Sequence, residues 1–258
     1  MKVKKQMLVA EETPWGNLEV WQDGSVRSLY IQDKLAIQSQ LDMVQKEKLL
    51  LPHTRAMMSF LIFQPQPQSM LLLGLGGGSI IHFLTHWFPG LEITAVEIND
   101  KVVKIGEKYF ALSPFPPKAQ VNIEIADAFA YLKRIKKKNV NVMLVDLHDG
   151  DALPNFMHTP AFMARCFHHL SSSGVLVINL LVKNEKEFTD TLTALRCSFS
   201  NISLCMAFKN QKNILLFAFK SPSVLNMTQL QARASQCQGK YNIEFEAFVS
   251  NIAKIDAK

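Results

Sequence analysis

The fold is decided by the stretch Met70-Leu71-Leu72-Leu73-Gly74-Leu75-Gly76-Gly77-Gly78-Ser79, an apolar run followed by four glycines in five positions. The apolar run is typical of a buried strand. Glycine lets the backbone turn tightly and approach a ligand closely, because it carries no Cβ. The first turn of a helix offers N–H groups that have no intrahelical partner. The sequence therefore predicts a strand, a ligand-binding loop and a helix over residues 79–88.

Strands and helices are expected to alternate on the C-terminal side of this loop. Such alternation indicates a parallel sheet with helices on both faces, and near-continuous apolar strands are typical of it. We expect antiparallel edge strands at 201–208 and 214–219, and a helical tail from 224. The other strands are expected at 91–96, 121–125, 142–145 and 175–178, and the other helices at 100–110, from 127, at 159–170 and at 185–196.

The N-terminal part differs in pattern. Gln22-Asp23-Gly24-Ser25 separates two apolar-rich segments, and Asp-Gly in such a place is a strong hairpin signal. Residues 40–63 have apolar side chains at helix-like spacings. We therefore predict a small antiparallel β domain over residues 1–48 and a Rossmann-like nucleoside-binding domain over residues 49–258.

Composition argues against a disordered chain, a nucleic-acid-binding protein, a cysteine metal site and a membrane-spanning protein. The 258 residues are 48% apolar and 19% charged, with a net charge of +6, so the chain can bury a sizeable core. The basic run 133–138 is expected to be a solvated helix end rather than a nucleic-acid surface. The cysteines show no metal-ligand spacing. No apolar run reaches the roughly 18 residues of a membrane-spanning helix, so we expect no membrane partner. The cysteines are expected to be reduced core thiols of a cytoplasmic protein, and the scattered basic residues favour no nucleic-acid partner.

Acidic residues after the next two strands suggest the ligand. A dinucleotide-binding loop requires a third glycine where Ser79 stands. Glu97 follows Gly74 by 23 residues, and an acid there can accept hydrogen bonds from both ribose hydroxyls. Asp127, after the third strand, is suited to an adenine amino group in an S-adenosyl arrangement, although it is also a good helix N-cap. These residues favour an S-adenosyl nucleoside over a dinucleotide.

The fourth strand is followed by Asp146-Leu147-His148-Asp149-Gly150-Asp151. Catalytic groups of an open parallel sheet lie at the carboxyl ends of its strands, so this acidic segment should lie beside the nucleoside and attract a cationic amine. Asp146 is best placed as general base, with its pKa raised by the nearby Asp149. The alternative is that Asp146 and Asp149 only form a turn, and a lone loop histidine such as His148 is more often a bystander.

Taken together, these motifs resemble the spermidine synthase (polyamine aminopropyltransferase) superfamily, in particular its divergent bacterial spermidine-synthase-like branch. The resemblance covers about residues 15–220. It rests on Gln38, the segment 51–58, Gly74–Ser79, Val96-Glu97-Ile98, Asp127-Ala128, Asp146–Asp149 and the N-terminal β unit.

The resemblance implies transfer of an aminopropyl group from decarboxylated S-adenosylmethionine to a polyamine such as putrescine, with release of methylthioadenosine. Asp146 would be the base and Asp149 would help to hold the amine. A homodimer is expected, as in the family, and no metal. Gln38 would contact the nucleoside, Glu97 the ribose and Asp127 the adenine. The expected nucleoside site therefore comprises Gln38, Gly74, Gly76, Gly77, Gly78, Glu97, Ile98, Asp127 and Ala128.

The sequence departs from the family pattern at the loop. The family's loop aspartate, which binds the aminopropyl amine, is replaced by Gly77, and this glycine leaves room for the methionine carboxylate of ordinary S-adenosylmethionine. An S-adenosylmethionine-dependent methyltransferase and a nucleoside-binding protein without turnover therefore stay open as alternatives, and a nicotinamide dehydrogenase is a minor one.

Overall fold

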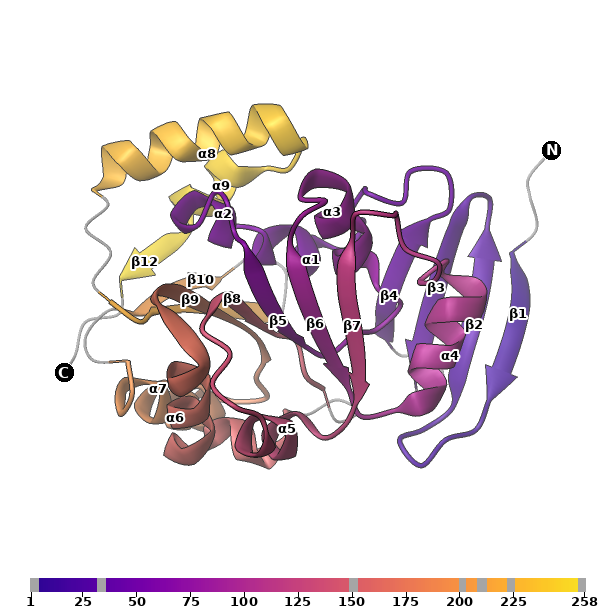
Figure 1. Cartoon of the computed structure of the whole chain (residues 1–258), viewed down its shortest axis with the longest axis horizontal. Helices are drawn as coiled ribbons and strands as arrows, with labels where there is room; N and C mark the ends of the chain where they lie inside the picture. The colour runs from indigo at the N-terminus through magenta and orange to yellow at the C-terminus, as the bar shows by residue number, and fades with distance from the viewer. Residues whose placement is uncertain are drawn as a thin grey trace.

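The computed structural model describes residues 5–31, 36–148, 153–199, 203–207, 213–221 and 226–254. The described chain forms a four-stranded sheet and an eight-stranded sheet with helices (Figure 1). The strands are β1 (Gln6–Glu11), β2 (Leu18–Asp23), β3 (Val26–Ile31), β4 (Ala36–Asp42), β5 (Ser69–Leu73), β6 (Glu92–Glu97), β7 (Gln120–Ile125), β8 (Val140–Val145), β9 (Leu170–Leu181), β10 (Ser203–Ala207), β11 (Asn213–Phe219) and β12 (Ile252–Lys254). The helices are α1 (Pro52–Met57), α2 (Phe60–Phe63), α3 (Ser79–Trp87), α4 (Asp100–Tyr109), α5 (Ala128–Arg134), α6 (Pro160–His169), α7 (Glu185–Arg196), α8 (Met227–Tyr241) and α9 (Phe245–Ser250), with the 3-10 helix η1 (Asn155–His158).

The N-terminal sheet is an antiparallel meander in the order β1-β2-β3-β4. Its central hairpin turns at Gly24 and Ser25, within the predicted turn segment 22–25; Gly24 has a φ of +58°, which glycine adopts at little cost. The expected helix over 40–63 is wrong up to residue 51, because β4 continues to Asp42 and pairs with β3, and the first helix, α1, begins only at Pro52. Strand pairing across β3 outweighs the helix-like spacing there.

The large sheet has the order β12-β10-β11-β9-β8-β5-β6-β7. Strands β5 to β9 are mutually parallel, whereas β11 and β10 are antiparallel, as predicted. The tail forms α8 and α9, but its return as the edge strand β12 was not expected. Since β5 lies between β6 and β8, the strand order reverses at its carboxyl end, which is where open α/β sheets bind ligands.

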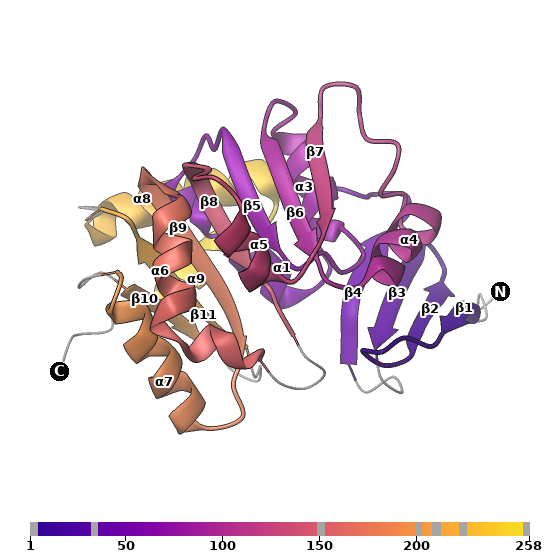
Figure 2. The same ribbon diagram turned by 60° about the horizontal axis from the view of Figure 1, so that its bottom comes forward.

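Two apolar clusters lie on opposite faces of this sheet. One contains side chains of α1, α2, α3, α8 and α9, and the other contains side chains of α5, α6 and α7. Figure 2 shows α5, α6 and α7 together on one face. No helix in the described ranges is long and apolar enough to cross a membrane.

The N-terminal sheet packs against α4. Leu18, Leu29 and Leu41 share a buried cluster with Ile105 and Phe110. The sheet is therefore held beside the carboxyl ends of β6 and β7 by apolar contact.

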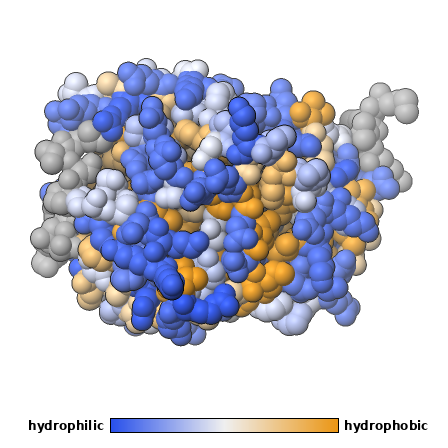
Figure 3. Space-filling view, viewed as in Figure 1, coloured by the Kyte–Doolittle hydropathy of each residue, from blue (hydrophilic) through white to orange (hydrophobic). Residues whose placement is uncertain are grey.

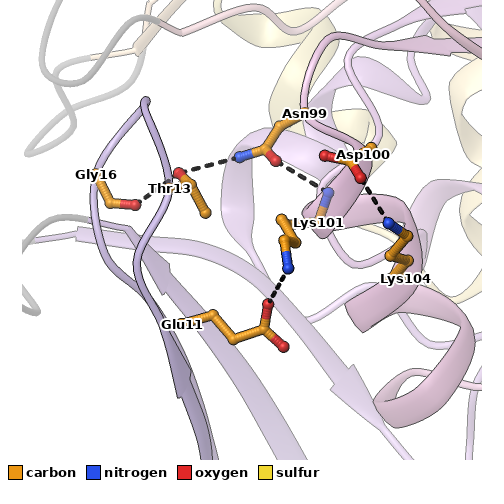
Figure 4. A network of polar contacts seen from close by, with 7 residues as sticks. All are labelled: Glu11, Thr13, Gly16, Asn99, Asp100, Lys101 and Lys104. Atoms are coloured by element: carbon orange, nitrogen blue, oxygen red, sulfur yellow. Dashed lines mark hydrogen bonds and ion pairs between the residues drawn. The ribbon is translucent and has the colours of Figure 1, made fainter.

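A polar network adds to this junction (Figure 4). Lys101 Nζ lies 3.3 Å from Glu11 Oε2, and Asn99 Nδ2 donates to Thr13 Oγ1 over 3.4 Å. Asn99 also caps α4, because its Oδ1 accepts from the backbone N–H of Lys101 at 3.0 Å. The network therefore joins the end of β1 and the turn after it to the start of α4, which follows Glu97.

Candidate active site

Backbone hydrogen bonds align the carboxyl ends of four parallel strands. The N–H of Asp146 donates to the carbonyl of Leu73 (2.8 Å), and the N–H of Gly74 donates to Val96 (2.8 Å). The N–H of Ala126 donates to the carbonyl of Glu97 (2.9 Å). As a result, the residues that follow β8, β5, β6 and β7 stand in one row, as the sequence predicts.

The glycine loop is built against the residue that follows β8. Gly74 has a φ of +95°, and a Cβ on it would lie 2.1 Å from the carbonyl oxygen of Asp146. Only glycine allows both the left-handed backbone and this approach. The first glycine therefore fixes the distance between the loop and Asp146.

The predicted residue Gln38 lies on β4, beside the other side of the loop. Its carbonyl oxygen is 3.7 Å from the Cβ position of Gly76. The next residue, Ser39, is buried, and its Oγ is 3.0 Å from the Cβ position of Gly77. The N-terminal sheet therefore supplies one wall of the loop, and the contact of Gln38 with a nucleoside stays a prediction.

The surroundings of Gly77 differ from the expectation that this glycine leaves open room. A Cβ on Gly77 would lie 3.0 Å from both Ser39 Oγ and Phe110 Cδ1, which is tighter than ordinary packing. Gly77 lies outside the left-handed region, so the crowding, rather than the backbone, disfavours a side chain. The space over this Cα is occupied by a hydroxyl and an aromatic edge.

Glu97 ends β6 and turns its carboxylate toward the loop. Its Oε2 accepts from the N–H of Leu75 at 3.1 Å, and its Oε1 accepts from the N–H of Asn99 at 3.0 Å. Burial raises the pKa of Glu97, and the backbone N–H groups around the carboxylate oppose this rise only in part. A carboxylate with two fixed donors in a partly buried place is a well-ordered acceptor for hydroxyl groups.

The remaining residues of the predicted nucleoside site lie beside exposed apolar side chains. Ile98, after Glu97, keeps 43% of its surface exposed, and Ile125, at the end of β7, keeps 56%. Figure 3 shows an exposed apolar region where Figure 1 places β6, β7 and α4. Asp127 caps α5 through a 2.7 Å hydrogen bond from the N–H of Ala130, and Ala128 is buried at the start of that helix. Capping leaves the second oxygen of Asp127 available to another donor.

Asp146 is held by two side chains on one oxygen. Asn179 Nδ2 donates to Asp146 Oδ1 over 2.8 Å, and His148 Nε2 lies 3.4 Å from the same atom. Burial alone would raise the pKa of Asp146, but the hydrogen bonds and the charges of His148 and His53 lower it well below its usual range. The expectation of a raised pKa is therefore wrong: within the described part of the chain, the neighbours that act on this carboxylate are the imidazoles of His148 and His53 and the amide of Asn179.

The pKa values of the two nearby histidines shift in opposite directions, although Asp146 raises both. Burial would lower the pKa of His148, but the hydrogen bond and the charge of Asp146 outweigh it and raise the value. Burial lowers the pKa of His53, on α1, and Asp146 compensates only in part. Of the two histidines, His148 is thus the one whose pKa is raised, and its Nε2 lies within 3.4 Å of Asp146 Oδ1.

Three features of the site were not predicted from sequence: Asn179 and the pairing of His148 at Asp146, and Ser39 beside Gly77. Asn179 could have been found as the lone polar residue within the apolar segment 175–181. The predicted residue Asp149 lies outside the described residues. Among the described residues no group of three or more His, Cys, Asp or Glu side chains is arranged to hold a metal ion.

Two surface cavities of about 400 and 380 Å³ lie beside Trp87 and Tyr241, between the end of α3 and the end of α8. None of the predicted site residues lines them. The candidate site is therefore defined by the row of strand ends and not by these cavities.

The strand order of the parallel sheet reverses at β5, a glycine loop follows this strand, and an acidic residue ends β6. These features define a Rossmann-like transferase fold. The sequence model of the spermine/spermidine synthase domain matches residues 53–214. A polyamine aminopropyltransferase of Chromobacterium violaceum is 31% identical over 238 residues, which cover 91% of this chain and 88% of that protein. The chain therefore belongs to the spermine/spermidine synthase family.

Solved structures agree on the fold. A probable spermidine synthase from Corynebacterium glutamicum superposes with a TM-score of 0.78 at 16% identity, over 96% of this chain and 90% of that one. Human methyltransferase-like protein 13, in complex with SAH, superposes with a TM-score of 0.66 at 22% identity, over 75% of this chain and 93% of that one. Aminopropyltransferases and methyltransferases thus share this architecture.

Proposed function

We propose that the protein transfers an aminopropyl group from decarboxylated S-adenosylmethionine to a small amine such as putrescine. The amine nitrogen forms a bond to the aminopropyl carbon next to the sulfonium, and the carbon–sulfur bond breaks with its electron pair moving to sulfur. The amine gives up one proton, and methylthioadenosine leaves. The observation that carries the proposal is the placement of Glu97 and Asp146 on either side of the glycine loop, together with membership of the family.

In this proposal the loop and the strand ends bind the nucleoside. Glu97 accepts from the ribose hydroxyls and the exposed face of Ile98 packs on the adenine. Asp127 and Ala128 bind the adenine edge, and Gln38 approaches from β4. Gly74, Gly76, Gly77 and Gly78 bring the backbone close to the sulfonium part. The SAH complex of a protein with the same fold supports an S-adenosyl ligand in this place.

Asp146 orients the amine and accepts a proton from the attacking nitrogen, which frees the lone pair that forms the bond to carbon. Its low pKa keeps it ionised at neutral pH, so it attracts the cationic amine, although a carboxylate of low pKa is a weak base. Asp149 would add a second negative charge for the amine. Bringing amine and donor into contact supplies much of the rate acceleration in such a transfer.

A methyltransferase is the second candidate, because of Gly77. The usual carboxylate for the aminopropyl ammonium is replaced by a position bounded by Ser39 and Phe110. Without that carboxylate, ordinary S-adenosylmethionine is less strongly rejected. The donor preference therefore distinguishes the two candidates.

A homodimer through the N-terminal sheet belongs to the same proposal. Strand β1 lies at the edge of this sheet, and an edge strand has backbone groups that can pair with a second copy. Sedimentation of the purified chain at several concentrations tests this, and a monomer throughout would contradict it.

The test of the function is incubation with decarboxylated S-adenosylmethionine and a panel of amines, followed by measurement of methylthioadenosine. The unaltered protein should release it only with an amine present. Asp146→Asn should abolish release while methylthioadenosine still stabilises the variant against heat, since a ligand stabilises the folded state that binds it. Methyl transfer from ordinary S-adenosylmethionine, without methylthioadenosine release from either donor, would favour the second candidate.

A further inference from the structure

A fully buried amide stands in the middle of an apolar strand. Asn179 on β9 has no exposed surface, and neither do its neighbours Ile178 and Leu180. A buried amide is costly unless its donors and its acceptor are hydrogen-bonded. Asn179 meets this requirement on both sides, since its Nδ2 donates to Asp146 Oδ1 (2.8 Å) and its Oδ1 accepts from Asn213 Nδ2 (3.0 Å).

The contact with Asn213 fixes which way the amide of Asn179 is turned. Asn213 begins β11, which is antiparallel to β9. Because its Nδ2 donates to Asn179, the oxygen of Asn179 must face β11 and the nitrogen must face β8. A chain of two amides therefore crosses three neighbouring strands and ends on the carboxylate of Asp146.

This chain orients the carboxylate. Asn179 and His148 both contact Oδ1 of Asp146, and in the described ranges no hydrogen bond is made to Oδ2. With one oxygen held from the sheet side, the other has a fixed direction at the carboxyl end of β8. A positioned acceptor is what attack by an amine requires.

We propose that Asn179 is a positioning residue for Asp146, which holds Oδ1 so that Oδ2 faces the attacking amine. The inference rests on the proposed aminopropyl transfer and names a residue that acts through the base. Asn213 supports it by fixing the orientation of the amide. A purely structural role for Asn179 would change stability and leave the pH dependence of turnover unchanged.

Two substitutions at this position separate these roles. Asn179→Leu removes the donor, and kcat should fall about tenfold with the KM of the donor substrate unchanged, because the loss of one hydrogen bond to a charged group is of this size. Asn179→Asp places a second carboxylate next to Asp146, so one of the two should hold a proton at mildly acidic pH. The pH profile of kcat for Asn179→Asp should therefore gain an acidic limb at a higher pH than that of Asn179→Leu, which only loses a hydrogen bond that lowers the pKa of Asp146.

The controls use other residues of the same sheet. Asn141, on β8, accepts from the backbone N–H of Gln68 at 2.8 Å, at the end of the strand away from Asp146. Asn141→Leu should lower the melting temperature without changing the profile. Asn213 is half-buried, so Asn213→Leu is expected to fold and can test the amide chain if the Asn179 variants do not fold. It should lower kcat by a smaller factor than Asn179→Leu.

A measurement independent of turnover separates this inference from the function. Carboxyl carbon NMR of protein labelled at aspartate can follow Asp146, which is assigned by the signal lost in Asp146→Asn. A new titration of this signal in Asn179→Asp would support the contact even if no donor and amine pair reacted. The same Asp146 titration and the same kcat profile in all folded variants would overturn the proposal.

Discussion

Glu97 Oε2 accepts a hydrogen bond of 3.1 Å from the backbone N–H of Leu75, inside the glycine loop. Its other oxygen accepts from Asn99, whose side chain reaches Thr13 of the N-terminal unit. The acid that the sequence assigns to the ribose therefore also joins the loop to the start of α4. The glycine loop and the start of α4 are therefore held by the same carboxylate.

Replacing Glu97 by glutamine should weaken nucleoside binding about 10- to 100-fold, because charge-assisted hydrogen bonds contribute about 1.5–3 kcal/mol. Isothermal titration with methylthioadenosine measures this. Glu92→Gln, an exposed position at the other end of β6, is the matched control. Equal affinities of Glu97→Gln and the unaltered protein would remove Glu97 from the nucleoside site.

Glu97→Gln should also change how the stability of the ligand-free protein depends on pH. Because burial raises the pKa of Glu97 above its value in the unfolded chain, the protonated carboxyl contributes stability that is fully present below about pH 4.3. That contribution is lost as the pH rises through the folded pKa. As the pH rises from 4 to neutrality, the melting temperature of Glu97→Gln should therefore increase relative to that of the unaltered protein.

His148 should control the pH dependence of turnover. Its pKa is raised by Asp146, so the stabilising charge of its imidazolium is present below about pH 6.5 and is lost as the pH rises through its folded value. Above that value Asp146 loses a neighbouring positive charge and becomes a stronger base. kcat should therefore rise with pH near and above neutrality.

His148→Gln should lose this rise and show an acidic limb at a higher pH, because the pKa of Asp146 is then less depressed. His86→Gln, at an exposed position of α3, is the control, and pH profiles at saturating amine are the measurement. The titration of the amine itself is common to both proteins and cancels in the comparison. A rise that survives in His148→Gln would have to come from another group.

The sequence predicts the parallel part of the fold well, because each strand from β5 to β9 is an apolar run and the glycine loop follows the first. It also predicts that Glu97 and Asp146 meet at the loop, since parallel strands end at one edge. It could not predict that β4 extends through residues 40–42, since this depends on pairing with β3. Nor could it predict the pKa of Asp146, which depends on Asn179 and His53 from distant strands and helices.

Donor selection should respond to position 77. Gly77→Asp restores the family's carboxylate, and Gly77→Ala adds the same Cβ next to Ser39 and Phe110 without the charge. The ratio of kcat/KM for decarboxylated over ordinary S-adenosylmethionine should be about 10- to 100-fold higher in Gly77→Asp than in Gly77→Ala. Equal ratios would mean that the donor's amino-acid end does not lie at this position.

Gly74 should tolerate no side chain at all. A Cβ there would lie 2.1 Å from the carbonyl oxygen of Asp146, and the φ of +95° disfavours any other residue. Overpacking and left-handed strain each cost about 1–3 kcal/mol, so Gly74→Ala should lower the free energy of unfolding by about 3 kcal/mol and move Asp146 away from the loop. Gly90→Ala is the control, because a Cβ at Gly90 meets nothing within 4 Å. Urea unfolding and methylthioadenosine titration check both effects; if Gly74→Ala keeps its stability and its affinity, the close contact between the loop and Asp146 does not exist in solution.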